Sequence, residues 1–457
     1  QQALEGMGVV FKLGVDVGKD ITVAEIEKAS DSVYIATGAW KQPVLGLSGE
    51  DMTQFGLNFL VEVNKYLKGR VGKEVLVCGG GIAGVAAALA AARTGARTLL
   101  LEREYMPGGL ATLGLVTIYL PLCDGEGHQV STGIAEELLR LSVVHGMEQS
   151  ALPTAWLTPQ GDPAERRAGR YQVQYNPHAF AIAAEQLLLQ AGVRLLYGTV
   201  AVQTLLQDDR ITGVIVENKS GRSAIRAGAV VDATGDADLC HLAGAGCETF
   251  RQGNVLAAWY YATRPDRGMQ LHMLGFCDVP DEYKSAEQKA SGQPRFGGLD
   301  AAEITAMMVQ AHAQELQDVL KHRQGGVPAE PATLPTIPQL RMTRRLAGVC
   351  TPDDKPTHRY EATSIGMIGD WRKRGPVYEL PFGCLYSGRV RNLYAAGRCI
   401  SVTDSMWDIT RVIPACAVTG QAAGTAAALG RGERPAIGAL QAQLHRDGVL
   451  LHCEEAL

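Results

Sequence analysis

Short apolar runs alternate with alanine-rich or amphipathic segments along most of this chain. Residues 75–78 and 98–102 form apolar runs that predict buried strands, and the alanine-rich residues 85–93 between them favour a helix. A strand, a helix and a second strand in this order indicate a parallel βαβ unit. The pattern therefore predicts an α/β fold.

The same pattern predicts further elements on both sides of this unit. In residues 1–70 we expect strands at 9–13 and 32–35 and helices at 23–29 and around 58–67. Downstream, the expected strands are 171–175, 193–197, 200–206, 211–217, 224–226, 229–232 and 392–397, and the expected helices are 179–190, 301–323 and 420–429.

Three glycines follow the first strand of the βαβ unit. Gly79, Gly81 and Gly84 form the pattern G-x-G-x-x-G between the predicted strand and helix. The first permits a tight turn, the second lets the backbone approach a pyrophosphate, and the third lets the helix pack closely on the strand. Glu102 ends the second strand, where a carboxylate can accept hydrogen bonds from a ribose hydroxyl. An acid there disfavours a 2′-phosphate, so the motif predicts FAD or NAD without choosing between them.

Two more predicted strands end at a glycine, where a backbone can pass close to a ligand. One ends in Ala233-Thr234-Gly235-Asp236 and the other in Ala396-Gly397-Arg398. The segment 419–424 then opens a predicted helix whose small residues permit close contact with a flat ring. An NAD-only dehydrogenase needs neither feature, so together they favour FAD.

With these motifs in place, residues 73–429 resemble the FAD-dependent oxidoreductases of the glutathione-reductase-like fold, in the family with a single interrupted FAD domain. The resemblance rests on residues 77–84, 102–109, 232–238, 396–398, 411–414 and 419–424. It implies that Gly397 approaches the pyrophosphate or ribityl chain and that a helix N-terminus at Gly420 faces the isoalloxazine, where it would stabilise an anionic reduced flavin. The implied cofactor-binding residues are Gly79, Gly81, Gly84, Glu102, Arg103, Gly109, Gly235, Asp236, Gly397, Arg398 and Gly420.

Residues 8–59 instead resemble part of the glutamate synthase small subunit and its relatives. The resemblance rests on residues 34–40 and 45–51. In those proteins this stretch closes one FAD lobe and leads into an NAD(P)H domain. The upstream glycine motif and the iron–sulfur cysteines are absent here. Residues 1–70 are therefore interpreted as a fragment of a second nucleotide-binding unit, or as a rearranged layout that packs on the main domain.

Composition narrows the function class. Glycine accounts for 53 of 457 residues, well above the usual share of about 7%, and the positions above explain its informative part. The net charge of −5 argues against a nucleic-acid binder, and no apolar run is long enough for a membrane span.

No two of the 10 cysteines form C-x-x-C, so we expect no metal site and no redox dithiol, in a reduced, cytoplasmic setting. The chain begins at Gln1 without Met, which is typical of a processed chain or a fragment.

Three residues are candidates for catalysis. His128 lies in the loop after the FAD-binding half and is either an acid–base group or a solvated loop histidine. Arg344, in the cluster with Arg341 and Arg345, either fixes a substrate carboxylate or forms a structural ion pair. Trp407, expected near the flavin ring, either stacks on substrate or flavin or belongs to an ordinary capped loop.

The sequence thus predicts a Rossmann-like FAD-binding domain with an inserted mixed β-rich substrate or cap domain. The expected layout is a partial nucleotide-binding segment at 1–70, FAD-domain parts at 71–245 and 386–457, and the cap at 246–385. The predicted function is hydride transfer between a small organic substrate and flavin, with NAD(P)H as a candidate electron donor. The alternative is a flavin-bearing electron-transfer or assembly subunit that acts with a partner chain or with a missing N-terminal domain.

Overall fold

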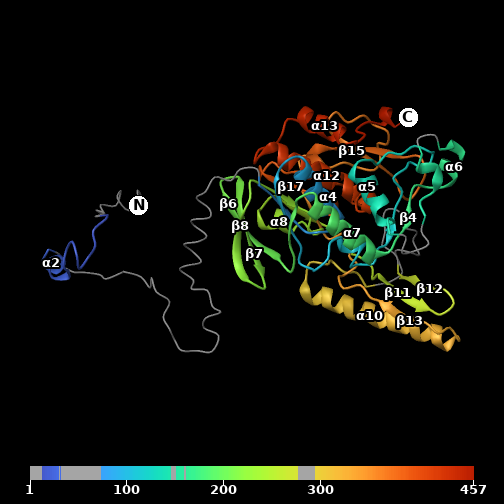
Figure 1. The fold of residues 1–457 in the computed structure, drawn as a ribbon, viewed down its shortest axis with the longest axis horizontal. Helices are drawn as coiled ribbons and strands as arrows, with labels where there is room; N and C mark the ends of the chain where they lie inside the picture. The colour runs from blue at the N-terminus through green and yellow to red at the C-terminus, as the bar shows by residue number, and fades with distance from the viewer. Residues whose placement is uncertain are drawn as a thin grey trace. The chain divides into compact units, whose positions relative to one another are not determined.

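The computed structural model of this protein describes residues 13–29, 31, 74–145, 151–158, 161–275 and 294–456. They divide between two units, residues 1–65 and 66–457. The larger unit contains the glycine motifs, and Figure 1 shows its layers of helices and strands.

A parallel sheet of five strands lies at the centre of the larger unit, in the order β17-β9-β1-β2-β5. Its strands are β1 (Glu74–Cys78), β2 (Arg97–Leu101), β5 (Arg194–Leu196), β9 (Ala229–Asp232) and β17 (Leu393–Ala395). In β1, Val77 lies opposite Leu100 of β2 and Val231 of β9. Four of the five residues of β1 are buried, because helices cover one face of the sheet and strands the other. Apolar runs without alternation are what such a doubly covered strand requires.

Helices cover one face of this sheet. They are α4 (Ile82–Arg93), α5 (Ile134–Ser142), α7 (Pro177–Gln190) and α12 (Ile413–Gly430). Val75, Val77 and Leu100 point to this side and join one core with the alanines of α4 and α12. The helices α4 and α12 lie so close that a Cβ at Gly420 or Gly424 would overlap a carbonyl oxygen of α4, at Ala83 and Ala87 respectively.

A three-stranded antiparallel sheet and a short helix cover the other face. They are β6 (Val200–Gln207), β7 (Arg210–Asn218), β8 (Gly221–Arg226) and α8 (Asp238–Leu242). Leu76, Leu101 and Val230 point to this side and form a second core with Val214 and Leu239. The strands predicted at 200–206, 211–217 and 224–226 are confirmed, and they pair as neighbours in one antiparallel sheet.

Smaller sheets come from the segment between β9 and β17 and, in the case of β3 and β4, from the chain before β9. The long helix α10 (Ala301–Gln324) contacts the antiparallel sheet β12-β11-β13, as Figure 1 shows in yellow and orange. The remaining sheets each pair two strands, and one of them packs on α12 and α13 (Ile437–Arg446) through β15. The three-stranded sheet consists of β11 (Ala258–Arg264), β12 (Gly268–Leu274) and β13 (Glu330–Thr333). The two-stranded sheets pair β3 (Ile118–Tyr119) with β4 (Val173–Gln174), β10 (Cys247–Thr249) with β14 (Arg344–Leu346), and β15 (Ser364–Gly369) with β16 (Val377–Pro381). Two further short helices, α6 (Pro163–Ala168) and α11 (Asp404–Thr410), also belong to the larger unit.

One predicted helix boundary is wrong. Helix α12 begins at Ile413 rather than at Gly420, so Gly420 lies inside the helix. Pro414 occupies the first turn, where its missing N–H removes no intrahelical hydrogen bond, so a proline there starts the helix instead of preventing it. Gly420 is tolerated inside the helix because it meets the backbone of α4.

The smaller unit contains one described helix, α2 (Val23–Lys28), where the sequence predicts a helix at 23–29. Its first turn is capped reciprocally, because the Glu25 carboxylate accepts from the N–H of Thr22 at 2.8 Å and the Glu25 N–H donates to Thr22 Oγ1 at 3.3 Å. The hydrogen bonds that the Glu25 carboxylate accepts, first from the Thr22 N–H and then from the Thr22 hydroxyl at 2.7 Å, lower the pKa of this carboxyl. The strand predicted at 32–35, the helix at 58–67 and most of the strand at 9–13 lie outside the described residues.

Within the described part of the chain, no single helix has both the length and the apolar character needed to cross a bilayer. Helices α11 and α12 meet that test only when they are joined across a break at which they bend by 92°.

Replacement of Gly424 by alanine is expected to destabilise the protein by about 1–3 kcal/mol, because the new methyl group would meet backbone atoms of α4 that cannot turn aside. Chemical denaturation measures the effect. The matched control is Gly438→Ala in α13, where a Cβ would meet open space and stability is expected to be unchanged or slightly higher. Equal stability of the two variants would contradict the close helix contact.

Candidate functional site

The turn between β1 and α4 uses its three glycines for three different reasons. Gly79 has a φ of +99°, and a Cβ there would overlap the carbonyl group of Ala233. A Cβ at Gly84 would overlap the carbonyl oxygen of Gly79, so this glycine lets α4 pack on the turn. At Gly81 a Cβ would meet nothing within 4 Å, and this residue precedes α4 without a capping side chain. The helix N-terminus is therefore open to a ligand, as anion binding requires.

Glu102 follows β2 and is held by the backbone. Its carboxylate accepts hydrogen bonds from Gly80 N at 2.6 Å and from Glu104 N at 2.9 Å. Burial raises the pKa of this carboxyl, while the two N–H groups oppose the rise. The hydrogen bonds fix the carboxylate beside the glycine turn, where it can still accept from a hydroxyl because each carboxylate oxygen has two lone pairs.

The loop after β9 is organised by a fully buried carboxylate. Asp232 accepts from Thr234 Oγ1 at 2.7 Å and from Cys240 N at 2.8 Å. Gly235, with a φ of +88°, lies against the guanidinium of Arg398. Arg398 Nη1 donates to the carbonyl oxygens of Leu340 and Arg341 at 3.2 and 3.1 Å. Its nearest carboxylate is that of Asp236, at the long distance of 3.9 Å.

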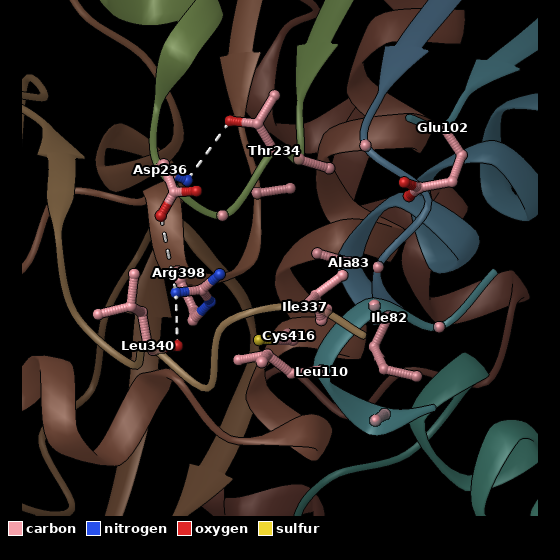
Figure 2. Close-up of a pocket in the computed structure, with 18 of the residues that line it drawn as sticks. Ile82, Ala83, Glu102, Leu110, Thr234, Asp236, Ile337, Leu340, Arg398 and Cys416 are labelled. Carbon is pink, nitrogen blue, oxygen red and sulfur yellow. Dashed lines mark hydrogen bonds and ion pairs between the residues drawn. The ribbon is translucent and has the colours of Figure 1, made fainter. Parts of the chain in front are cut away.

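These residues surround one elongated cavity that contains about 1520 Å³ of empty space, part of it open to solvent. Figure 2 shows Glu102 on one side and Arg398 with Asp236 on the opposite side. The apolar part of the wall comprises Leu110, Ala111, Val116, Ile118, Leu120, Ile337, Pro338 and Leu340.

A second helix N-terminus lies at the cavity wall. Val412, Ile413 and Cys416, from the start of α12, line the cavity together with Arg411. The Arg411 guanidinium pairs with the fully buried Asp408, at 3.0 Å from Nε and 2.5 Å from Nη2. Positive helix ends and arginines thus occur along the wall, which favours a ligand with several negative groups.

Comparison with known families decides the identity of this protein. The profile of the family described as FAD dependent oxidoreductase matches residues 74–258 and 352–442, more than half of the chain. The chain belongs to the FAD-dependent oxidoreductase family. It is therefore an oxidoreductase with a Rossmann-type fold, as the sequence predicts.

A second profile, pyridine nucleotide-disulphide oxidoreductase, matches residues 6–108 of this FAD-dependent oxidoreductase. The chain is 34% identical over 108 residues to the NADPH-Fe(3+) oxidoreductase subunit beta of Geobacter sulfurreducens, covering 22% of this chain and 16% of that one. It is 29% identical over 125 residues to the glutamate synthase [NADPH] small chain of Escherichia coli, covering 24% and 26%. The chain thus matches about a sixth to a quarter of the length of these relatives.

Among solved structures, a p-nitrophenol 4-monooxygenase from Pseudomonas putida is similar with a TM-score of 0.41 and 14% identity, over 82% of this chain and 80% of the other.

Eight of the eleven residues predicted to bind the cofactor line the cavity of this oxidoreductase: Gly79, Gly81, Glu102, Arg103, Gly109, Gly235, Asp236 and Arg398. The other three lie behind its wall. Gly84 and Gly420 hold the helices together, as described above. Gly397 has a φ of +66°, donates its N–H to Thr419 Oγ1 at 3.0 Å and lies against Ala83 and Cys416. Their close packing positions the residues that do face the cavity.

None of the three candidates for catalysis is among the cavity-lining residues. His128 Nδ1 lies 2.8 Å from the carboxylate of Asp124. Arg344 pairs with Asp238 at 2.6 Å and donates to the carbonyl oxygen of Asp236 at 2.9 Å. Trp407 is fully buried and donates from Nε1 to the carbonyl oxygen of Arg398 at 2.9 Å. The latter two contact residues of the wall from behind.

Two arginines of the wall were not singled out by the sequence. Arg341, from the cluster that contains Arg344, is the member that lines the cavity, and Arg411 lies at the start of α12. The cluster was a usable signal for Arg341, but an irregular segment does not reveal which of its side chains points inward. For Arg411, the only sequence feature that could have indicated a place at the cavity was its position just before the alanine-rich helix.

The residues of the cavity fit FAD. The open helix N-terminus at Gly81 suits a pyrophosphate, Glu102 suits a ribose, and the apolar wall near Ile413 suits a flat ring. Positive groups at Arg398 and Arg411 supply charge where phosphates or a reduced ring would be negative.

Glu102→Gln is expected to weaken FAD binding by about tenfold or more, because hydrogen bonds to charged groups contribute more than neutral ones. A glutamine also has one acceptor oxygen for the two N–H groups of Gly80 and Glu104. Titration of FAD-depleted protein with FAD measures the dissociation constant. Glu217→Gln, at an exposed glutamate of β7, is the control with unchanged affinity. Wild-type affinity of Glu102→Gln would refute its assignment to the ribose.

Proposed function

We propose that this oxidoreductase transfers a hydride between a small organic substrate and FAD. The observation that carries the proposal is that a single cavity is lined by Glu102, by the start of α4 and by the start of α12. Apolar side chains line the wall between its polar ends. Bound FAD would supply the redox chemistry, since flavins exchange hydrides with organic substrates and nicotinamides.

The residues of the chain have separate roles in this proposal. Glu102 and Arg103 hold the adenosine end, and the N–H groups after Gly81 hold the pyrophosphate. Arg398 binds the linker between pyrophosphate and ring, because it projects into the cavity and its pairing with Asp236 is long. The N-terminus of α12, with Arg411, faces the ring and favours negative charge on it.

Substrate binding is assigned to the wall contributed by residues 337–341. Ile337, Pro338 and Leu340 present apolar surface that excludes water from the ring. Arg341 is 4% exposed, and its guanidinium lies 5.5 Å from the centre of the Trp259 ring. A guanidinium held in this way can bind a carboxylate in bidentate fashion, so we transfer to Arg341 the role first considered for Arg344.

Trp407 and Arg344 are proposed as positioning residues. The Trp407 indole N–H holds the carbonyl oxygen of Arg398, and its ring meets Phe250 edge-on with centroids 5.9 Å apart. Arg344 fixes the backbone of Asp236 from outside the cavity. His128 stays a candidate acid–base group, although Asp124 now engages its ring.

The domain layout follows from the same assignments. Residues 71–245 and 386–457 would form the FAD domain, and residues 246–385 would cover it and bind the substrate. In support, residues 337–341 come from this middle segment and line the cavity. Residues 1–70 would be part of a second nucleotide-binding unit, in keeping with the profile match over 6–108.

A second candidate function is that of a flavin-bearing subunit whose electrons come from or go to a partner chain. The observation that favours it is the similarity to a protein named as the beta subunit of an NADPH-Fe(3+) oxidoreductase. NADPH is accordingly a candidate electron donor, alongside NADH.

The purified protein is expected to show the absorbance bands of a bound flavin, and heat denaturation should release FAD rather than FMN, as identified by chromatography. The physical reason is that the cavity wall offers a carboxylate for a ribose at Glu102 and apolar surface for a flat ring at Ile337 and Leu340. A colourless protein that cannot be reconstituted with FAD would exclude the proposed function.

Anaerobic reduction distinguishes the two candidates. If the protein is a complete enzyme, NADH, NADPH or an organic hydride donor bleaches the flavin bands of the isolated chain, because the reducing site lies within it. Photochemical reduction is the control that shows the flavin is reducible. Bleaching by NADPH only after a partner chain is added would favour the subunit instead.

A further inference from the structure

A cluster of metal-ligating side chains lies away from the FAD cavity, between α10 and the β11–β12 hairpin. It consists of His272 from β12 and Asp318 and His322 from α10, one helical turn apart. One ligand atom from each lies within 4.8 Å of the others. The long helix α10 and its sheet are seen together in Figure 1. None of these residues lines the cavity described above.

Two imidazole nitrogens and one hydroxyl converge on a single carboxylate oxygen. His272 Nδ1 lies 2.9 Å from Asp318 Oδ2, His322 Nε2 lies 3.5 Å from the same atom, and Tyr260 Oη donates to it at 2.7 Å. The rings of His272 and His322 meet edge-to-face with centroids 5.1 Å apart. The nitrogen of each ring that is nearest to the carboxylate therefore faces the same small volume.

The two separations from Asp318 are close to the distance between neighbouring ligands of one metal ion. Two ligands about 2.0–2.2 Å from a tetrahedral zinc ion stand roughly 3.3 Å apart. The observed separations of 2.9 and 3.5 Å lie on either side of that value. Shifts of a few tenths of an ångström, which side-chain rotation provides, would admit the ion.

A buried carboxylate beside the cluster supplies a second, independent observation. Glu315 lies on α10 one turn before Asp318, is 1% exposed, and neither of its carboxylate oxygens has a hydrogen-bond partner. Burial raises the pKa of Glu315 to about 7. A buried unpaired carboxylate is costly, and a cation in the cluster would offset that cost.

We propose that His272, Asp318 and His322 bind a divalent transition-metal ion. Two imidazoles and one carboxylate suit zinc and its neighbours rather than calcium or magnesium, which prefer oxygen ligands. The side chains of His272, Asp318 and His322 are 14, 20 and 35% exposed, so the ion has a path from solvent and a water molecule can complete the coordination.

The ion would fasten α10 to the sheet that contacts the FAD domain. Strand β11, next to β12, carries Tyr261, whose hydroxyl lies 2.7 Å from Thr117 Oγ1. It also carries Trp259, over which the guanidinium of Arg341 lies. The ion would thus link α10 to β12, and its binding does not depend on the proposed reaction.

The test is zinc binding by the full-length, tag-free flavoprotein after treatment with a chelator, measured by equilibrium dialysis and calorimetry. One high-affinity zinc ion per chain is expected, together with a higher thermal unfolding temperature. His272→Ala and His322→Ala are each expected to weaken binding by about tenfold or more and to remove the thermal shift, because each deletes a ligand. His312→Ala, at an exposed histidine of the same helix, is the matched control and should bind as wild type.

Circular dichroism and flavin content establish that each variant is folded. If His272→Ala does not fold, His322→Ala and Asp318→Asn decide the matter, since His322 is the most exposed of the three ligands. The proposal is overturned if the wild-type protein takes up no zinc, or if folded His322→Ala and Asp318→Asn bind it with the affinity of His312→Ala.

Discussion

The contact between α4 and α12 is the constraint on which the rest of this structure depends. The two helices are separated by more than 300 residues, yet Gly420 and Gly424 bring the backbone of one against the carbonyl groups of the other. This approach places both helix N-termini at the same cavity. It also fixes Gly397, because the Thr419 hydroxyl on α12 accepts the Gly397 N–H. The cavity is therefore shaped by missing side chains as much as by those that are present.

Two fully buried carboxylates of the larger unit each have hydrogen-bond donors. Fully buried carboxylates at Asp232 and Asp408 hold, respectively, the loop before Asp236 and the guanidinium of Arg411. Each carboxylate is satisfied by backbone N–H, hydroxyl or arginine donors, which is the condition under which a buried charge is tolerated. Arg398 is the exception, since its nearest carboxylate is distant. A positive charge that the protein balances only loosely is available to a phosphate-bearing ligand.

Much of the fold could be predicted from the sequence, because the hydrophobic patterns that indicate its strands and helices lie within short stretches of the chain. The apolar runs at β1 and β2, the meander of β6–β8 and the helix α10 were all expected close to their observed bounds. Errors arose where a local signal had two meanings. The small residues at 419–424 suggested a helix that begins at Gly420, whereas Gly420 lies inside the helix and allows its close contact with α4. Pro414 suits the first turn of the helix, which begins at Ile413. Arg341 and Arg344 could not be separated either, because only packing determines which one faces the cavity.

The sequence by itself determined the βαβ unit, the glycine turn and Glu102, because a strand, its turn and the following helix are set by adjacent residues. Only the tertiary structure decided which residues from distant segments meet. It placed Arg411 and the start of α12 at the cavity and left Trp407 behind the wall. It also joined His272 of β12 to Asp318 and His322 of α10, two elements that no sequence spacing relates. Long-range contacts depend on how whole elements pack, and no local pattern encodes that packing.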